Sequence, residues 1–508
     1  MSKSVGKKPN ILLIMADQLR PDALGCYGNK VCRTPHLDSI AAGGVVFDKA
    51  YSPNPVCVPA RASLTCGAHS LTCAMYQGGG GPIKPDQTKL AEHFRSFGYG
   101  AYACGKLHYA HYSPPDKPRL VHGFETWDSH ESGRIIYQFD RKNQLRGVED
   151  YMDFLTDSGW KGFSRAHGIG NNDIRPCPSP LPEELCPDHW VADRTIARIE
   201  AHRKDRPDDP FLVFCSFPKP HSPYDPPLPW ATMYSPKDIP PPVGDESMIM
   251  DRNPAMQRER IRRAMDTISP EARLVIKAYY YGLISFQDFQ VGRVLASLKR
   301  LGVSDDTIIV YTADHGDMMG DFGTWFKGIA LEGSSHLPLL VKGPGIPAGQ
   351  RRRQLAGLQD VLPTLAGLTG CPLKRPLDGA DLTVPLKDAK APIREGSGYV
   401  RDLYYSNYGQ KDWNCAMVTD GRWKYCYSEQ GPTEELYDLD SDPGELVNLA
   451  SKPGNADLVG SWREKLIGQA RRLGHTDILK PDGGLTGVPC DRAAIDKMPI
   501  TEMGWRWY

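Results

Sequence analysis

The chain has 508 residues, and its 61 Lys and Arg residues balance 61 Asp and Glu residues, so that its formal net charge is zero. A hydrophobic content of 40% is enough to build a large core, which excludes an intrinsically disordered chain. The absence of a positive excess argues against a protein that binds nucleic acid through bulk charge. The length alone allows roughly two to four domains.

Short apolar runs with the pattern of buried parallel strands alternate with amphipathic segments along the first three quarters of the chain. The expected strands are residues 11–16, 99–104, 211–217, 307–312 and 337–342. The expected helices are residues 89–97, 190–199, 270–301 and 354–370. This alternation predicts an α/β fold with a mostly parallel sheet flanked by helices.

Two long stretches between these elements, residues 109–187 and 218–243, are rich in proline and aromatic side chains. Ordered loops of this length commonly carry substrate specificity. Within the first loop, His111, His122 and His130 either contact substrate or are structural.

The pattern changes near residue 395 to short alternating segments and turns, which predicts a smaller C-terminal subdomain with an antiparallel sheet. We therefore expect a catalytic α/β domain at residues 1–394 and the subdomain at residues 395–508. The aromatic-rich tail of that subdomain packs either on its own subunit or on a neighbouring one.

No segment reaches the roughly 18 consecutive apolar residues of a membrane helix, and the N-terminus lacks the features of a signal peptide. The 13 cysteines are scattered and show no zinc-type or disulfide-type spacing. We therefore expect a cytoplasmic protein that has no membrane or nucleic-acid partner.

Polar residues follow four of the expected strands, at the edge where ligands bind in open α/β sheets. One such residue is usually part of a turn, but four groups at one edge predict a functional site. Two aspartates, an amide and an imidazole suit a divalent cation. The residues concerned are Asp17 and Gln18, Lys106 and His108, His221, and Asp314 and His315.

Cys57 lies two residues before Pro59, which suits the first turn of a helix. A helix N-terminus favours anions and lowers the pKa of a thiol there. Arg61 can bind a tetrahedral oxyanion through its planar guanidinium. The simpler interpretation of Cys57, from composition alone, is a buried cysteine before a helix.

The pattern Cys57-x-Pro59-x-Arg61 closely resembles the signature of type I sulfatases in the alkaline phosphatase superfamily. The resemblance spans roughly residues 9–450, and it implies an alkaline-phosphatase-like sheet. It also implies that a maturation enzyme oxidises Cys57 to formylglycine. The other matching motifs, in family order, are Asp17, Gly105-Lys106-x-His108, Pro220-His221, Asp314-His315-Gly316-Asp317, Lys327 and Glu332.

The pairs Asp17-Gln18 and Asp314-His315 resemble the branch that contains choline sulfatases, phosphonate monoester hydrolases and some bacterial arylsulfatases. The chain departs from the family pattern at His336, where arginine is usual, and at Cys66, which puts recognition by the maturation enzyme in some doubt.

The resemblance implies a role for each candidate residue. One divalent metal ion, Ca²⁺ or Mn²⁺, would be bound by Asp17, Gln18, the formylglycine at position 57, Asp314 and His315. Arg61 and Lys106 would steady the formylglycine hydrate, and His108 would act as the base that releases sulfate. His221 and Lys327 would contact the sulfate and protonate the leaving oxygen. The expected partners are a small organic sulfate, the maturation enzyme and further copies of the chain in a homo-oligomer.

Two alternatives stay open. The first is a phosphonate monoester or phosphodiester hydrolase with the same nucleophile, although Lys106 and His108 argue against it. The second is a non-catalytic protein that binds a metal or an anion and keeps Cys57 as a thiol.

Overall fold

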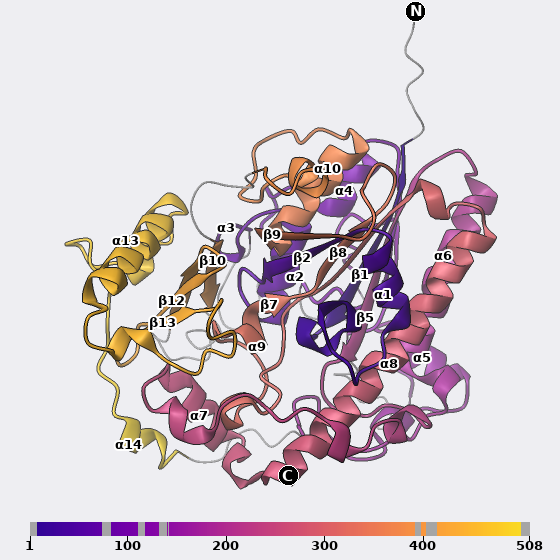
Figure 1. Cartoon of the computed structure of the whole chain (residues 1–508). Helices are drawn as coiled ribbons and strands as arrows, with labels where there is room; N and C mark the ends of the chain where they lie inside the picture. The colour runs from indigo at the N-terminus through magenta and orange to yellow at the C-terminus, as the bar shows by residue number, and fades with distance from the viewer. Residues whose placement is uncertain are drawn as a thin grey trace, which may run out of the picture.

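The computed structural model describes residues 8–73, 83–109, 117–131, 140, 142–391, 398–402 and 414–498. These residues form a nine-stranded sheet and a separate four-stranded sheet, with helices around both (Figure 1). Within the described ranges, no helix has the length and apolar character needed to span a membrane.

The large sheet has the order β4-β3-β5-β1-β6-β8-β2-β7, and β9 pairs with β2. Its central strand β1 runs parallel to both β5 and β6, and all of its residues are buried. A strand covered on both faces is a continuous apolar run, which is why the sequence pattern located it. The strands are β1 (Asn10–Asp17), β2 (Val45–Tyr51), β3 (Gly100–Gly105), β4 (Thr126–Ser129), β5 (Phe211–Pro220), β6 (Thr307–Ala313), β7 (His336–Leu337), β8 (Leu339–Lys342) and β9 (Gln350–Gly357).

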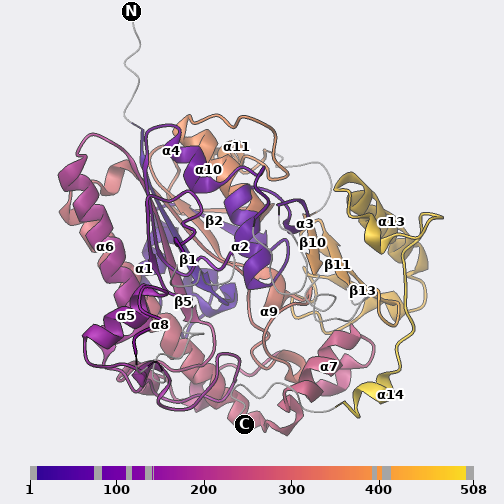
Figure 2. The same ribbon diagram turned by 180° about the vertical axis from the view of Figure 1, so that it is seen from behind.

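Helices cover the large sheet on both sides. Opposite views show α1 and α8 in front of the sheet in Figure 1 and α2 in front of it in Figure 2. The 31-residue α8 packs against α6, and both contact β5. The helices of this region are α1 (Pro35–Ala42), α2 (Cys57–Cys66), α3 (Ser70–Cys73), α4 (Leu90–Arg95), α5 (Asp150–Asp157), α6 (Pro187–Asp205), α7 (Pro254–Arg262), α8 (Pro270–Arg300), α9 (Glu332–Ser335), α10 (Val361–Thr369) and α11 (Thr383–Lys387).

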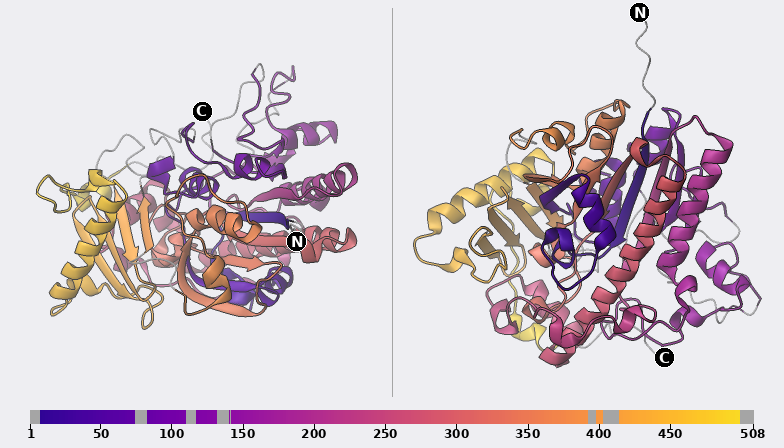
Figure 3. Two further views of the ribbon diagram at one scale, coloured as in Figure 1. Left: turned by 90° about the horizontal axis from the view of Figure 1, so that it is seen from above. Right: turned by 45° about the vertical axis from the view of Figure 1, so that its right-hand side comes forward.

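The second sheet is antiparallel, as the alternating pattern predicts. It consists of β10 (Gly398–Asp402), β11 (Cys415–Thr419), β12 (Trp423–Ser428) and β13 (Thr433–Asp438), in that order. Helix α13 (Ala456–Arg472) lies along its outer side (Figure 3), where Trp462 and Leu466 share a core with strand residues such as Tyr425. The short helix α14 (Arg492–Ile495) follows. The boundary after residue 394 and the aromatic tail lie outside the described residues, and the division at residue 394 stays a prediction.

The direction predicted for the last strand is wrong. Residues 337–342 form β7 and β8, and β8 pairs with β6 in the antiparallel direction. A parallel neighbour would need a long crossover, usually a helix. Between β6 and β8 the chain forms loops, a 3-10 turn (Asp321–Gly323), the four-residue helix α9 and β7, so that no long helix carries it back across the sheet.

The helix predicted for residues 354–370 is correct only in its second half. Its first residues belong to β9, which pairs parallel with β2, and α10 begins at Val361. The arginine run at residues 351–353 lies within β9, and Arg352 is 2% exposed. Its guanidinium donates to the carbonyls of Pro385 and Leu386, which explains how a charged residue can be buried there.

Candidate active site

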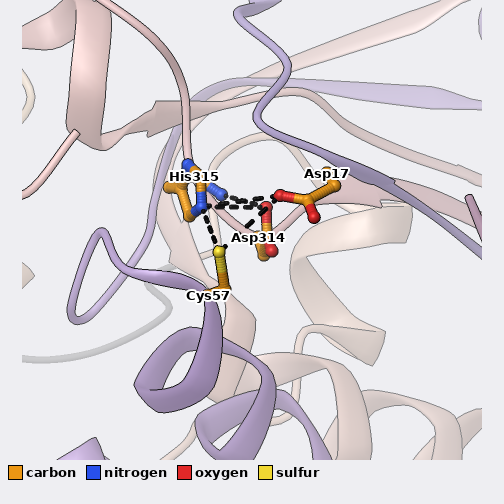
Figure 4. A group of neighbouring side chains, drawn as sticks. All are labelled: Asp17, Cys57, Asp314 and His315. Atoms are coloured by element: carbon orange, nitrogen blue, oxygen red, sulfur yellow. Dashed lines mark hydrogen bonds and ion pairs between the residues drawn. The ribbon is translucent and has the colours of Figure 1, made fainter. Parts of the chain in front are cut away.

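The residues that follow β1, β3, β5 and β6 converge with the first turn of α2 at one edge of the large sheet. The side-chain ligand atoms of Asp17, Cys57, Asp314 and His315 lie within 4.8 Å of one another, and all four residues are buried (Figure 4). Parallel strands bring their carboxyl ends to the same edge, so the prediction that these residues meet there is confirmed.

Cys57 is the first residue of α2, as its distance from Pro59 predicts. Its Sγ lies 3.2 Å from Nε2 of His315 and 3.8 Å from Oδ1 of Asp17. Burial and the charge of Asp17 would raise the pKa of the thiol. The opposing charges of Lys106, Lys327 and His315 outweigh both, and lower the pKa to about 7. The thiol therefore lies in surroundings that favour a negative charge at position 57.

Arg61, one helical turn beyond Cys57, is 1% exposed. Its Nε donates to Oδ2 of Asp314 at 2.7 Å, and Nη1 donates to the carbonyl of Lys106 at 2.7 Å. The ammonium of Lys106 pairs with Asp17 Oδ2. Burial alone would raise the pKa of Asp17, but Lys106, His221 and Arg61 hold it well below the usual value. Both carboxylates of the cluster thus have a buried cation beside them.

Gln18 and Lys327 form a contact next to this cluster. The backbone of Gln18 has a φ of 69°, and its amide N–H donates to Oδ1 of Asp314 at 3.0 Å. Nζ of Lys327 donates to the side-chain oxygen of Gln18 at 2.6 Å. Lys327, which is far from the strand ends in sequence, therefore lies at the predicted site.

Asp317 is a residue for which the sequence suggested no role. Its Oδ1 accepts the backbone N–H groups of Met319 and Phe326, at 2.9 and 2.8 Å. Its Oδ2 accepts the hydroxyl of Tyr224 at 2.6 Å and Nε2 of Gln18 at 2.5 Å. Asp317 therefore determines which way the amide of Gln18 points. Its only signal in the sequence was its place in the motif that follows β6.

His221 is 2% exposed, and its Nδ1 lies 2.7 Å from the carbonyl of Ser222. A carbonyl can only accept, so Nδ1 carries the proton and Nε2 is the atom left to face a ligand. Burial, together with Lys327 and Lys106, lowers the pKa of the ring well below its usual value. The ring is therefore neutral in the absence of an added anion.

His108 lies at the end of the segment that follows β3. Its backbone has a φ of 53°, a conformation that side chains other than glycine adopt only at some cost. Glu131 stabilises it, because one carboxylate oxygen accepts the N–H groups of both Leu107 and His108, at 3.0 and 2.8 Å. The sequence had suggested no role for Glu131.

The other loop histidines have structural surroundings. The ring of His122 packs edge-on against Tyr109, with centroids 4.8 Å apart. Nδ1 of His130 contacts Oε1 of Glu149. His111 lies outside the described residues. Their contact with a substrate stays a prediction.

The donor set fits a divalent cation. Two fully buried carboxylates and an imidazole already converge on one point, and hard oxygen ligands with one imidazole suit Ca²⁺ or Mn²⁺. Lys106 and Arg61 lie beside the same point and can bind an anion. A cation-type centre beside anion-binding residues and a potential nucleophile defines a hydrolase for anionic esters.

Comparison with known proteins shows which family of hydrolases the chain resembles. The sulfatase family model matches residues 9–371, and a model for the C-terminal part of N-sulphoglucosamine sulphohydrolase matches residues 320–472. An arylsulfatase of Clostridium perfringens is 31% identical over 483 residues, which cover 92% of this chain and 96% of that protein. A choline-sulfatase of Rhizobium meliloti is 29% identical over 456 residues, with 88% and 83% covered.

Among solved structures, a phosphonate monoester hydrolase of Agrobacterium radiobacter superposes with a TM-score of 0.74 at 25% identity, covering 92% of this chain and 96% of that one. The chain belongs to the sulfatase family, within the alkaline phosphatase superfamily. It is an enzyme, a sulfuric ester hydrolase.

Proposed function

We propose that the enzyme hydrolyses a small organic sulfate monoester with a formylglycine at position 57 and one divalent ion. In the balanced reaction, the ester and one water give an alcohol and sulfate. The observation that carries the proposal is the position of Cys57, whose Sγ lies 3.2 Å from His315 Nε2 and beside Asp17 in a buried cluster of metal-type ligands. Such a place suits a nucleophile activated beside a cation.

The ion would be held by Asp17, Gln18, Asp314 and His315, with position 57 as a further ligand. It would supply positive charge that offsets the repulsion between an anionic ester and an anionic nucleophile. A hydrated formylglycine would supply two hydroxyls on one carbon, one to attack sulfur and one whose deprotonation releases sulfate. The side chains around these hydroxyls would orient the nucleophile and transfer the protons.

Arg61 and Lys106 lie within reach of Asp314 and Asp17 and would keep the nucleophile oriented. A sulfate ester between His221 and Lys327 adds negative charge beside the imidazole, which favours its protonated form. Because Nδ1 already donates to the Ser222 carbonyl, the added proton would be on Nε2 and could pass to the leaving oxygen. His108 would take the proton from the second hydroxyl.

The second candidate is a phosphonate monoester or phosphodiester hydrolase with the same nucleophile. The observation in its favour is the likeness to the Agrobacterium radiobacter enzyme over 92% of the chain. The homo-oligomer, the maturation enzyme and the cytoplasmic location stay predictions from the sequence.

The test has two parts. Mass spectrometry of the peptide with position 57, from a host that makes formylglycine, should show the aldehyde, whereas material with only intact thiol would contradict the nucleophile. Steady-state rates on an aryl sulfate, an aryl phosphonate monoester and a phosphodiester should rank the sulfate first, and Cys57→Ala should abolish turnover of all three. A phosphonate or diester rate higher by orders of magnitude would favour the second candidate.

A further inference from the structure

Lys219, two residues before His221, has a buried ammonium whose hydrogen bonds and ion pair within the described residues all go to the turn around that histidine. Its Nζ donates to the carbonyls of His221 and Pro223, at 3.3 and 2.7 Å, and pairs with Oδ1 of Asp225. An ammonium has three donors, so these contacts use all of them. Lys219 therefore joins three points of the turn at residues 219–225.

The ion pair between Lys219 and Asp225 is charged at neutral pH. Burial would raise the pKa of Asp225, but Lys219 and a hydrogen bond from His167 hold it below the usual value. A buried ion pair adds little net stability, because desolvation offsets the attraction. The clearest consequence of this pair is geometric, since it fixes the turn in one conformation.

The turn is supported from two directions. On one side, Nε2 of Gln287 in α8 donates to the carbonyl of Lys219 at 2.6 Å. On the other, Oγ of Ser222 donates to the carbonyl of Asn171 at 3.0 Å, and His167 lies 3.2 Å from Oδ2 of Asp225. Both partners belong to the long loop for which the sequence predicts a role in specificity.

A cavity runs along the turn, and Lys219, His221 and Asp225 are among its lining residues. The described hydrogen bond of the His221 ring goes to Ser222, which belongs to the same turn. A movement of the turn would therefore carry the imidazole with it.

We propose that Lys219 is a positioning residue that, with Asp225, fixes where the His221 imidazole meets the leaving oxygen. The inference rests on the proposed function, because it requires His221 to act at that oxygen. A displacement of about 1 Å in a reacting group can cost roughly a hundredfold in rate.

The test compares two substrates that differ in their need for a proton. An aryl sulfate with a nitrophenol leaving group departs without protonation, whereas an unactivated alkyl sulfate needs an acid at the leaving oxygen. The variant His221→Ala should therefore lose more kcat on the alkyl sulfate than on the aryl sulfate. Lys219→Met should show the same bias, with a loss of about tenfold to a hundredfold on the alkyl sulfate and little change in KM. Lys219→Arg should recover part of the loss.

The matched control is Lys161→Met. Nζ of Lys161 donates to the carbonyl of Asp140 and to the side-chain oxygen of Asn143, so that it joins residues of the long loop without contact to the turn. Its ratio of alkyl to aryl rates should equal that of the parent enzyme. Asp225→Asn keeps the size of the side chain, removes the charge beside Lys219, and should show the same bias to a smaller extent.

The possible outcomes distinguish a failure of the positioning role of Lys219 from a failure of the proposed role of His221. If His221→Ala discriminates between the substrates while the folded variants of Lys219 and Asp225 lower both rates equally, the positioning role is wrong and the proposed function stands. If His221→Ala itself shows no bias, the role of His221 fails and the inference fails with it. Should Lys219→Met not fold, Asp225→Asn and Lys219→Arg decide the matter by the same ratio.

Discussion

The charged residues of the site form close pairs, each with one acidic and one basic side chain. Asp314 contacts Arg61, Asp17 contacts Lys106, and Sγ of Cys57 lies within 4.8 Å of a carboxylate oxygen of each aspartate. The pKa of the Asp17 carboxyl stays well below its usual value because Lys106, His221 and Arg61 outweigh the effect of burial. Under the proposed function, Arg61 and Lys106 would also bind the anionic substrate or nucleophile.

Asp317→Asn should weaken metal binding without a change in the size of the side chain. The new amide would face Nε2 of Gln18 with a second donor, and Gln18 would have to rotate its oxygen away from Lys327. Loss of such an outer contact typically costs about 10-fold to 100-fold in metal affinity. Calorimetric titration of Mn²⁺ into chelator-treated enzyme measures it. The control Tyr224→Phe removes another partner of Asp317 and leaves Gln18 oriented, so equal affinity in both variants would contradict the assignment.

The sequence alone identifies the site residues that follow strands. It does not identify the residues that position them through hydrogen bonds. Asp17, Asp314 and His221 could be predicted because the carboxyl ends of parallel strands share an edge. Asp317, Glu131 and Lys219 could not, because their roles depend on hydrogen bonds that form only in the folded chain, and no strand-end pattern marks such residues. Nothing local in the sequence marks a carboxylate that accepts two distant N–H groups.

At the scale of whole elements, the strands predicted from the sequence agree with the structure where both faces of the strand are buried. Strands β1, β3, β5 and β6 are buried throughout, whereas β9 begins with exposed residues and ends with buried ones, and its last four residues fall within the helix predicted for residues 354–370. The reversed direction of β8 could not be predicted, since an apolar run does not show which way its strand points, and the long connection at residues 314–338 contains no long helix to cross the sheet. The prediction of the site does not depend on the direction of β8, because the candidate ligands come from the four parallel strands and α2.

The contact between α1 and α8 should make stability depend on pH. Both oxygens of Asp288 in α8 accept N–H groups at the start of α1, from Leu37 at 2.8 Å and His36 at 3.1 Å. Burial nevertheless raises the pKa of Asp288 to about 7. The folded protein thus holds a proton that the unfolded chain releases near pH 4, and stability falls as pH rises from about 4 to 7.

Asp288→Asn removes this dependence. Relative to the variant, the parent protein should lose up to about 3 kcal/mol of unfolding free energy between pH 5 and pH 8, measured by urea titration at each pH. The constant offset from altered hydrogen bonds does not matter, since only the change with pH is compared. Asp305→Asn, at an exposed position, should run parallel to the parent; a parallel course for Asp288→Asn would show that its pKa is not raised.

Apolar contacts and buried cations, Lys424 among them, connect the second sheet to the part of the chain that carries the large sheet. Tyr51 of β2 shares a small core with Met417 and Cys426 of the second sheet. Beside it, Nζ of Lys424 in β12 lies 3.0 Å from Glu332 of α9 and 2.8 Å from Glu445. Because α9 follows the loop that carries Asp314 and Lys327, the second sheet supports the segment that completes the site.

Lys424→Met should therefore destabilise the protein strongly. The ammonium is fully buried, and its removal leaves two carboxyl groups without their cation, which typically costs about 3–5 kcal/mol. The loss should grow from pH 6 to pH 8, because the remaining buried carboxyls would hold protons in the folded state that the unfolded chain releases. Urea unfolding at both pH values measures it. Lys465→Met, which removes an exposed lysine over the ring of Trp462 in the same subdomain, should cost less than about 1 kcal/mol. If both variants lost equally little, Lys424 would not be what holds the two sheets together.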